Sequence, residues 1–186
     1  MKTSINYQII QKRKLYPSLW DGGETFEYII YPKDSNYSAR DFLFRISSAT
    51  IQKTPSHFTK FQQYKRYLVM LTNSLEINRN GNLEYYTENE VFEFSSNDEI
   101  ISYSLGEDFN LMVSEKIKNS SVEITDFLSH TNSDFLFIFA KEETEIHLNQ
   151  IELKLQANDL VFIDNRNREF ITLISKQLVL VGLIDL

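Results

Sequence analysis

The stretch Phe42-Leu43-Phe44-Arg45-Ile46-Ser47-Ser48-Ala49-Thr50 predicts a β-strand with apolar residues on both faces. Successive side chains of a strand point to opposite faces, so one face carries Phe42, Phe44, Ile46 and Ser48, and the other carries Leu43, Arg45, Ser47 and Ala49. A strand that is apolar on both faces is typical of a sandwich or barrel interior. Because burying a lone guanidinium costs several kcal/mol, Arg45 must meet either a carboxylate of the chain or an anionic ligand.

Short apolar segments continue on both sides of this strand and indicate an all-β fold. They include 26–31, 67–71, 91–94, 100–105, 109–113 and 135–139. Asn80-Gly81 is the dipeptide favoured in a type I′ hairpin turn. The composition agrees, since Phe 14 and Tyr 10 accompany only Gly 5 and Pro 3 in 186 residues. Aromatic residues are enriched in strands, and this amount of apolar surface argues against disorder.

The second half of the sequence echoes the first at an offset of 69 residues. In that register Glu76 aligns with Glu145, Asn80 with Asn149, and the segment 89–91 with 158–160. Each copy reads as strand, turn, strand and an acidic turn into another strand, which indicates two similar β units. This pattern resembles the double-stranded β-helix of cupins, and two copies would make a bicupin of two double-stranded β-helix (jelly-roll-like) barrels packed together. The expected boundaries are an N-terminal barrel at 1–115, a polar connecting segment at 116–134 with a helical turn near 124–128, and a C-terminal half at 135–186.

Several motifs in order along residues 20–112 resemble the HutD/Ves family of bicupins. They are Trp20-x-Gly22-Gly23-x-Thr25-x-Glu27 followed by Pro32, then 44–50, Phe58-Thr59-x-Phe61, Arg66-x-Leu68-x-x-Leu71 and Gly106-x-Asp108-Phe109-Asn110-Leu111-Met112. The resemblance implies a small cytosolic protein associated with histidine utilisation or stress response, with a suspected role in sensing or binding a small metabolite. The C-terminal half carries little of this signature and is assigned by continuity.

Charge and composition limit the classes of partner. The net charge of −7 is spread without blocks, so no nucleic-acid surface is expected. There is no apolar run long enough for a membrane span and no signal-peptide pattern, which favours a cytoplasmic protein. The absence of cysteine fits a reducing compartment. The oligomeric state is open, with a homodimer as one alternative.

Neither a metal centre nor a cofactor is expected. The three histidines, His57, His130 and His147, form no His-x-His pair, and Glu145 with His147 on one strand face would supply only two ligands. A nucleophile elbow is also missing. Glu27 remains a candidate general base, so a metal-independent cupin enzyme, either an isomerase or a hydrolase, is the rival function.

Polar residues in strands that should be buried form the candidate binding site. We expect a pocket in the N-terminal barrel that binds a small anionic metabolite, a carboxylate held by a free Arg fork. The alternative is a closed network in which Glu27 pairs with Arg45 and Asp108 with Arg66. Trp20 with its glycines is read either as a lid whose backbone reaches the ligand or as a turn with an aromatic plug. The full candidate set is Trp20, Gly22, Gly23, Thr25, Glu27, Arg45, Ser47, Arg66, Asp108 and Asn110.

Overall fold

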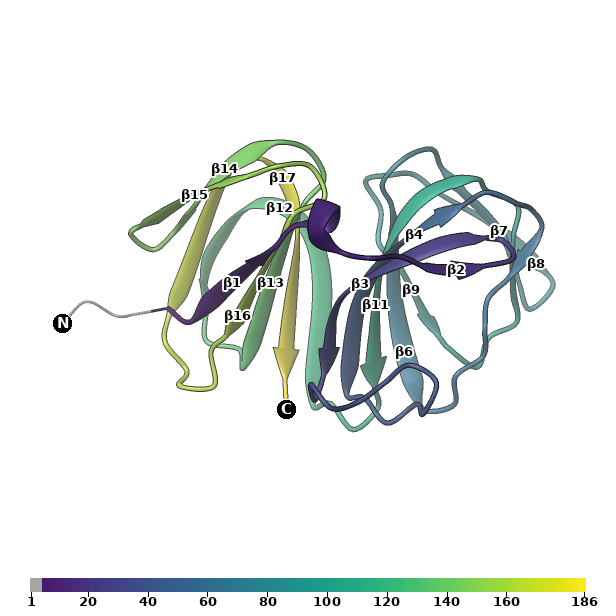
Figure 1. Ribbon diagram of the computed structural model, residues 1–186, viewed down its shortest axis with the longest axis horizontal. Coiled ribbons are helices and arrows are strands. Elements are labelled where there is room, and N and C mark those ends of the chain that lie inside the picture. Colours follow the sequence, from purple (N-terminus) through teal and green to yellow (C-terminus); the bar gives the residue numbers. More distant parts are fainter. Residues whose placement is uncertain (1–4) are drawn as a thin grey trace. The chain divides into compact units, whose positions relative to one another are not determined.

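The computed structural model describes residues 5–186, whose regular secondary structure consists almost entirely of β-strands (Figure 1). One 3-10 turn, η1 (Lys12–Lys14), interrupts them near the start of the chain. The described residues fall into two compact units, 15–116 and a second unit made of 5–14 with 117–186. Within this part of the chain, no helix is long and apolar enough to span a membrane. The expectation of an all-β protein is confirmed.

The unit of residues 15–116 contains two sheets. The six-stranded sheet runs in the order β2 (Ser18–Trp20), β3 (Gly23–Tyr31), β4 (Phe44–Ile51), β11 (Gly106–Ser114), β6 (Tyr64–Met70) and β9 (Phe92–Ser95). The four-stranded sheet runs in the order β5 (Ser56–His57), β10 (Ile100–Ser102), β7 (Leu75–Arg79) and β8 (Asn82–Tyr86). Most of the segment 42–50, which was expected to be a strand with apolar residues on both faces, forms β4. This strand is the third of the larger sheet and pairs antiparallel with β3 and β11.

Two apolar clusters stabilise this unit. One joins both sheets and contains Leu68, Met70, Leu75, Ile77, Phe92, Phe94 and Ile100. The other lies around Phe42, Phe61, Tyr64 and Met112, where the Tyr64 hydroxyl donates to the carbonyl of Phe42 at 2.6 Å. On the six-stranded sheet these cluster residues share a face with Arg45, because Met112 is opposite both Arg45 and Arg66, and Arg66 is opposite Phe94.

The second unit is one seven-stranded sheet. Its strands run in the order β1 (Tyr7–Ile10), β16 (Leu160–Asp164), β13 (Phe135–Ala140), β17 (Ile171–Asp185), β14 (Thr144–Leu148) and β15 (Ile151–Leu155), and β12 (Asn119–Thr131) pairs with β17. The long strand β17 pairs with β14 through 173–175 and with β13 through 179–184. Besides its pairing with β12, the strand β17 thus pairs first with β14 and then with β13 along its length. Apolar residues from most of these strands form one buried cluster, among them Leu136, Ile146 and Val181.

The expected boundaries of the two halves differ from the observed ones in two places. The segment 116–134 is mostly β12, which pairs with β17 from Asn119 to Thr131, so it is part of the sheet and forms no helical turn. The start of the chain also changes unit, because β1 pairs with β16. A strand that is hydrogen-bonded to a single neighbour can be polar. The polar composition of β12 was therefore interpreted in the sequence as that of a connecting segment. Residues 1–4 of the expected first unit lie outside the described residues.

The echo at 69 residues corresponds to matching hairpins. Asn80 ends β7 at φ 52° and Asn149 ends β14 at φ 53°, so both adopt the left-handed conformation. Each side-chain oxygen accepts a backbone N–H from a later segment, that of Glu99 for Asn80 and that of Thr172 for Asn149. The asparagine at the corresponding position of each half therefore links its hairpin to a later segment, the residue before β10 in the first half and the start of β17 in the second.

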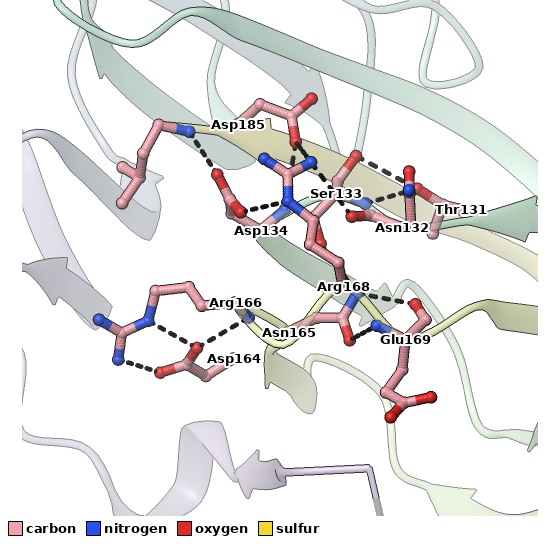
Figure 2. Close-up of polar contacts among 11 residues, drawn as sticks. Thr131, Asn132, Ser133, Asp134, Asp164, Asn165, Arg166, Arg168, Glu169 and Asp185 are labelled. Atoms are coloured by element: carbon pink, nitrogen blue, oxygen red, sulfur yellow. Dashed lines mark hydrogen bonds and ion pairs between the residues drawn. The ribbon is translucent and has the colours of Figure 1, made fainter. Parts of the chain in front are cut away.

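A polar cluster closes one end of the second unit (Figure 2). Arg168 lies between two carboxylates, with Nε 2.8 Å from Asp134 Oδ1 and Nη1 3.1 Å from Asp185 Oδ1. The other oxygen of Asp134 accepts the backbone N–H of Leu186 at 2.9 Å. Asn165 donates to the carbonyls of Ser133 and Glu169. The contacts hold the turn after β16 against the last residues of β17, which indicates a structural role.

Candidate functional site

A pocket of about 500 Å³ lies on the face of the six-stranded sheet that carries Arg45, within the unit 15–116. Strand register aligns the polar side chains in rows across neighbouring strands. Glu27 of β3 is opposite Ser47 of β4, which is opposite Asn110 of β11. In the next row, Arg45 is opposite Met112, and Met112 is opposite Arg66 of β6. Because a strand presents every second residue on one face, four strands contribute to a single pocket wall.

Arg45 meets a carboxylate of the chain. Its Nε lies 2.6 Å from Oε2 of Glu27, and its Nη1 donates to the hydroxyl of Ser47 at 3.2 Å. The guanidinium also lies over the ring of Tyr37, 4.4 Å from its centroid. The side chain of Arg45 is 10% exposed and that of Glu27 is 40% exposed. This half of the closed network is present, and Arg45 is not the free fork.

Arg66 has no such partner. Among residues 5–186, no carboxylate oxygen lies within 4.0 Å of its guanidinium, and its one hydrogen bond is a long contact of 3.5 Å from Nε to Asn110 Oδ1. The guanidinium instead lies near two rings, 5.3 Å from the centroid of Phe58 and 5.1 Å from that of Phe94. Burial lowers the pKa of Arg66, and nearby Arg45 adds to this effect. Arg66 is thus a cation that lines the pocket with most of its N–H donors unused.

Asp108 is the second ionisable group of the pocket that forms no ion pair among residues 5–186. Its side chain is buried, with 4% of the residue exposed, and Oδ1 has no hydrogen-bond partner. Burial raises the pKa of this carboxyl to about 7, although the Arg66 cation and the backbone N–H of Ala49 act in the opposite direction. The expected ion pair of Asp108 with Arg66 does not form. Half of the closed network is therefore missing.

Trp20 covers part of the pocket wall and is half-exposed. Its indole N–H donates to the hydroxyl of Thr25 at 3.2 Å, and both side chains line the pocket. The ring lies on Gly22, where a Cβ would be 2.0 Å from the ring carbon Cζ3. At Gly23 a Cβ would be 1.8 Å from the carbonyl oxygen of Thr50 on the neighbouring strand. Glycine is required at both positions by close packing.

Eight of the ten residues in the candidate set line this pocket: Trp20, Thr25, Glu27, Arg45, Ser47, Arg66, Asp108 and Asn110. Gly22 and Gly23 are not in the lining, and they act through the placement of Trp20 and β3. Tyr37, His57 and Phe58 also line the pocket but were not in the candidate set. Strand alternation did not identify Tyr37 and His57, and Phe58 was noted only as part of a family motif. Tyr37 comes from a loop after β3, where no periodicity indicates which way a side chain points.

Within residues 5–186, no three side chains of His, Cys, Asp or Glu lie close enough together to hold a metal ion. His57 lines the pocket, whereas His130 and His147 belong to β12 and β14 of the other unit. The ionisable side chains that line the pocket are two guanidinium groups, two carboxyl groups, the imidazole of His57 and the phenol of Tyr37.

Residues 12–181 match the family model of HutD. The chain belongs to the HutD family. A conserved protein of unknown function from Pseudomonas aeruginosa PAO1, PA5104, is similar in structure at a TM-score of 0.84 and 19% identity, covering 97% of this chain and 100% of that one. HutD from Pseudomonas fluorescens SBW25 is similar at a TM-score of 0.83 and 17% identity, covering 97% and 98%.

The likeness extends to cupins outside the family. A cupin 2 conserved barrel domain protein from Leptotrichia buccalis is similar at a TM-score of 0.60 and 8% identity, and 99% of each chain is covered. At such identities the likeness shows the fold alone. The expected HutD-type bicupin fold is confirmed. No match was found among curated proteins.

Proposed function

We propose that this HutD-type cupin protein binds a small carboxylate in the pocket of the unit 15–116, with Arg66 as the residue that binds the anion. The observation that carries the proposal is the state of Arg66, a pocket-lining cation with no ion-pair partner among residues 5–186. A buried or partly buried guanidinium is ordinarily paired, so an unpaired one in a pocket favours an anionic ligand.

The planar fork of Arg66 suits a carboxylate, because its parallel N–H groups match the two oxygens. Asn110, beside it, and Ser47, in the next strand, offer neutral hydrogen-bonding groups. The volume of about 500 Å³ lies in the range of small-molecule sites. These features favour a small metabolite over a polymer.

A regulatory or sequestering role is the second part of the proposal. Membership of the HutD family supports it, as does the resemblance to HutD/Ves proteins linked to histidine utilisation or stress response. The rival, an enzyme with Glu27 as general base, has less support from the geometry. One oxygen of Glu27 is engaged by Arg45 at 2.6 Å. The unpaired carboxyl of the pocket is Asp108.

The test is calorimetric titration with formate and acetate. The structure of HutD from P. fluorescens was determined in a formate condition, which makes formate a simple first probe. Wild type should bind saturably, and its melting temperature should rise with carboxylate concentration. Arg66→Met should weaken binding at least about tenfold, since a hydrogen bond to a charged group contributes about 1.5–3 kcal/mol and about 1.4 kcal/mol equals a factor of ten.

Arg79→Met is the matched control. Arg79 lies in the same unit and pairs with Glu84 at 2.9 Å, but it does not line the pocket. This variant should keep wild-type affinity. Equal affinity of Arg66→Met and wild type, or no saturable binding of either probe, would contradict the proposal. Consumption of a bound carboxylate, followed by NMR, would favour the enzyme instead.

A further inference from the structure

The charges that line the pocket leave one cation and one carboxyl group without an ion-pair partner among residues 5–186. Glu27 and Arg45 compensate each other at 2.6 Å. Arg66 and Asp108 remain, and they do not contact each other: Arg66 reaches Asn110, while Oδ1 of Asp108 has no partner. The pocket is therefore electrically balanced with Asp108 ionised, and it carries one positive charge in excess when Asp108 is protonated.

The immediate surroundings of Asp108 disfavour its ionised form. Its cross-strand neighbours are Ala49 of β4 and Met70 of β6, both uncharged, and only 4% of the residue is exposed. Isolated charges in such surroundings are costly. The other titratable and charged groups that line the pocket with Asp108 are Arg66, Arg45, Glu27, His57 and Tyr37. Glu107 precedes Asp108 on the same strand.

A carboxylate bound at Arg66 would compete with an ionised Asp108 for the same cation. Two negative charges would then share one uncompensated positive charge, and one of them, on Asp108, would be almost fully buried. Protonation of Asp108 removes the conflict. The protonated carboxyl can donate a hydrogen bond through its O–H group, whereas Oδ1 has no hydrogen-bond partner in the ligand-free pocket. The negative charge of the ligand then takes the place of the charge on Asp108.

We propose that the pocket takes up a small monocarboxylate together with one proton, which Asp108 binds. This inference rests on the proposed function and adds the charge class of the ligand and the residue that selects it. No covalent bond changes: the proton comes from solvent, and the complex has the same net charge as the ligand-free pocket with Asp108 ionised. The carboxyl of Asp108 has a pKa of about 7, so the coupling operates near neutrality.

The binding constant must then depend on pH by linkage. Below about pH 6, Asp108 already carries the proton and affinity for formate should be constant. Above about pH 8, the apparent dissociation constant should rise about tenfold per pH unit, because a full proton must be added for each ligand bound. At pH 9 binding should be at least tenfold weaker than at pH 6.

The experiment is calorimetric titration of the full chain with formate between pH 6 and 9, in pairs of buffers that differ in ionisation enthalpy. The difference in heat between buffers gives the protons taken up per formate, which should approach one above about pH 8. Asp108→Asn, which keeps the shape and cannot ionise, should bind formate at pH 9 nearly as well as at pH 6, without proton uptake. His57→Gln should keep the pH dependence and the proton uptake of wild type, whatever its affinity, which separates Asp108 from the histidine of the pocket.

Three outcomes overturn the inference. If wild type binds formate equally well at pH 6 and 9 without proton uptake, the coupling is absent, although the proposed function stands. If the pH dependence persists in Asp108→Asn or disappears in His57→Gln, another group carries the proton. If formate and acetate fail to bind at every pH, the proposed function fails and the inference fails with it. The proton count comes from wild type, so it does not depend on whether a variant folds.

Discussion

The polar residues of the pocket divide into those that are paired within the chain and those that form no ion pair among residues 5–186. Arg45 belongs to the first kind. It donates to Glu27 and Ser47, and its guanidinium lies on the ring of Tyr37. Arg66 and Asp108 belong to the second kind, since neither forms an ion pair within 4.0 Å among residues 5–186.

We expect Arg45→Met to lower the free energy of unfolding by about 1–2 kcal/mol. Removing one member of a fully buried pair costs about 3–5 kcal/mol, but Glu27 is 40% exposed and water can solvate it, which reduces the cost. Urea denaturation followed by circular dichroism measures the change. In a double-mutant cycle with Glu27→Gln, the coupling should be favourable to the wild-type pair. Additive effects of the two substitutions would mean that the 2.6 Å contact has no energetic weight.

The sequence indicated the residues of the pocket but not their partners. Alternation along β3, β4, β6 and β11 is enough to place Glu27, Arg45, Arg66 and Asp108 on one face. It cannot tell that Arg45 reaches Glu27 while Arg66 stops short of Asp108, because that depends on side-chain length and on the aromatic neighbours Phe58 and Phe94. Tyr37 comes from a loop, and its contact with Arg45 has no signature in the sequence.

At the scale of elements, the hairpins were predictable and the sheet partners were not. Asn80-Gly81 is a local turn signal, and the echo at Asn149 made the second hairpin visible too. The pairing of β1 with β16 joins residues about as far apart as the chain allows, and no local pattern encodes it. β12 is apolar only at scattered positions, and it is stabilised as a strand by its long ladder with β17.

The hairpin asparagine of the second unit allows a test of two separate contributions. Asn149 combines a φ of 53° with side-chain bonds to the backbone N–H of Thr172 and the carbonyl of Phe170. Asn149→Gly keeps the backbone conformation and loses those bonds, which contribute about 1 kcal/mol each. Asn149→Ala should cost about 1 kcal/mol more than Asn149→Gly, because alanine disfavours the left-handed region. Thermal denaturation of both variants measures the difference.

The first-unit equivalent is a matched control. Asn80 has a φ of 52° and accepts the backbone N–H of Glu99. The alanine and glycine variants at position 80 should rank in the same order as those at 149. If alanine is as good as glycine at either site, the left-handed conformation is not what selects asparagine there.

For the molecule as a whole, opposite pKa shifts predict a stability maximum at mildly acidic pH. The pKa of Asp108 is raised to about 7 from its usual 3.8, so its contribution to stability is full below about pH 4 and is lost as the pH rises to about 7. The pKa of Asp164 is lowered by hydrogen bonding to Arg166. Its contribution is present above its usual pKa and is lost as the pH falls.

The free energy of unfolding should therefore decline between about pH 5 and 7, measured by urea denaturation across pH 4–9. Asp108→Asn should abolish this decline and be more stable than wild type at pH 8, because it leaves no buried group to ionise. Asp164→Asn should keep this decline. It should be less stable than wild type above about pH 4, where the ionised Asp164 contributes to stability. A decline of the same size in Asp108→Asn and wild type would place the responsible group elsewhere.

Trp20 has a use that follows from its position on Gly22 and Thr25. It is the single tryptophan of the sequence, and it lines the candidate pocket. The emission of an indole responds to the polarity and hydrogen bonding around it, and here that environment is the pocket itself. The protein therefore contains its own fluorophore at the place where a ligand would arrive. Occupancy of the pocket can be followed by intrinsic fluorescence on the native chain, with no label and no substitution.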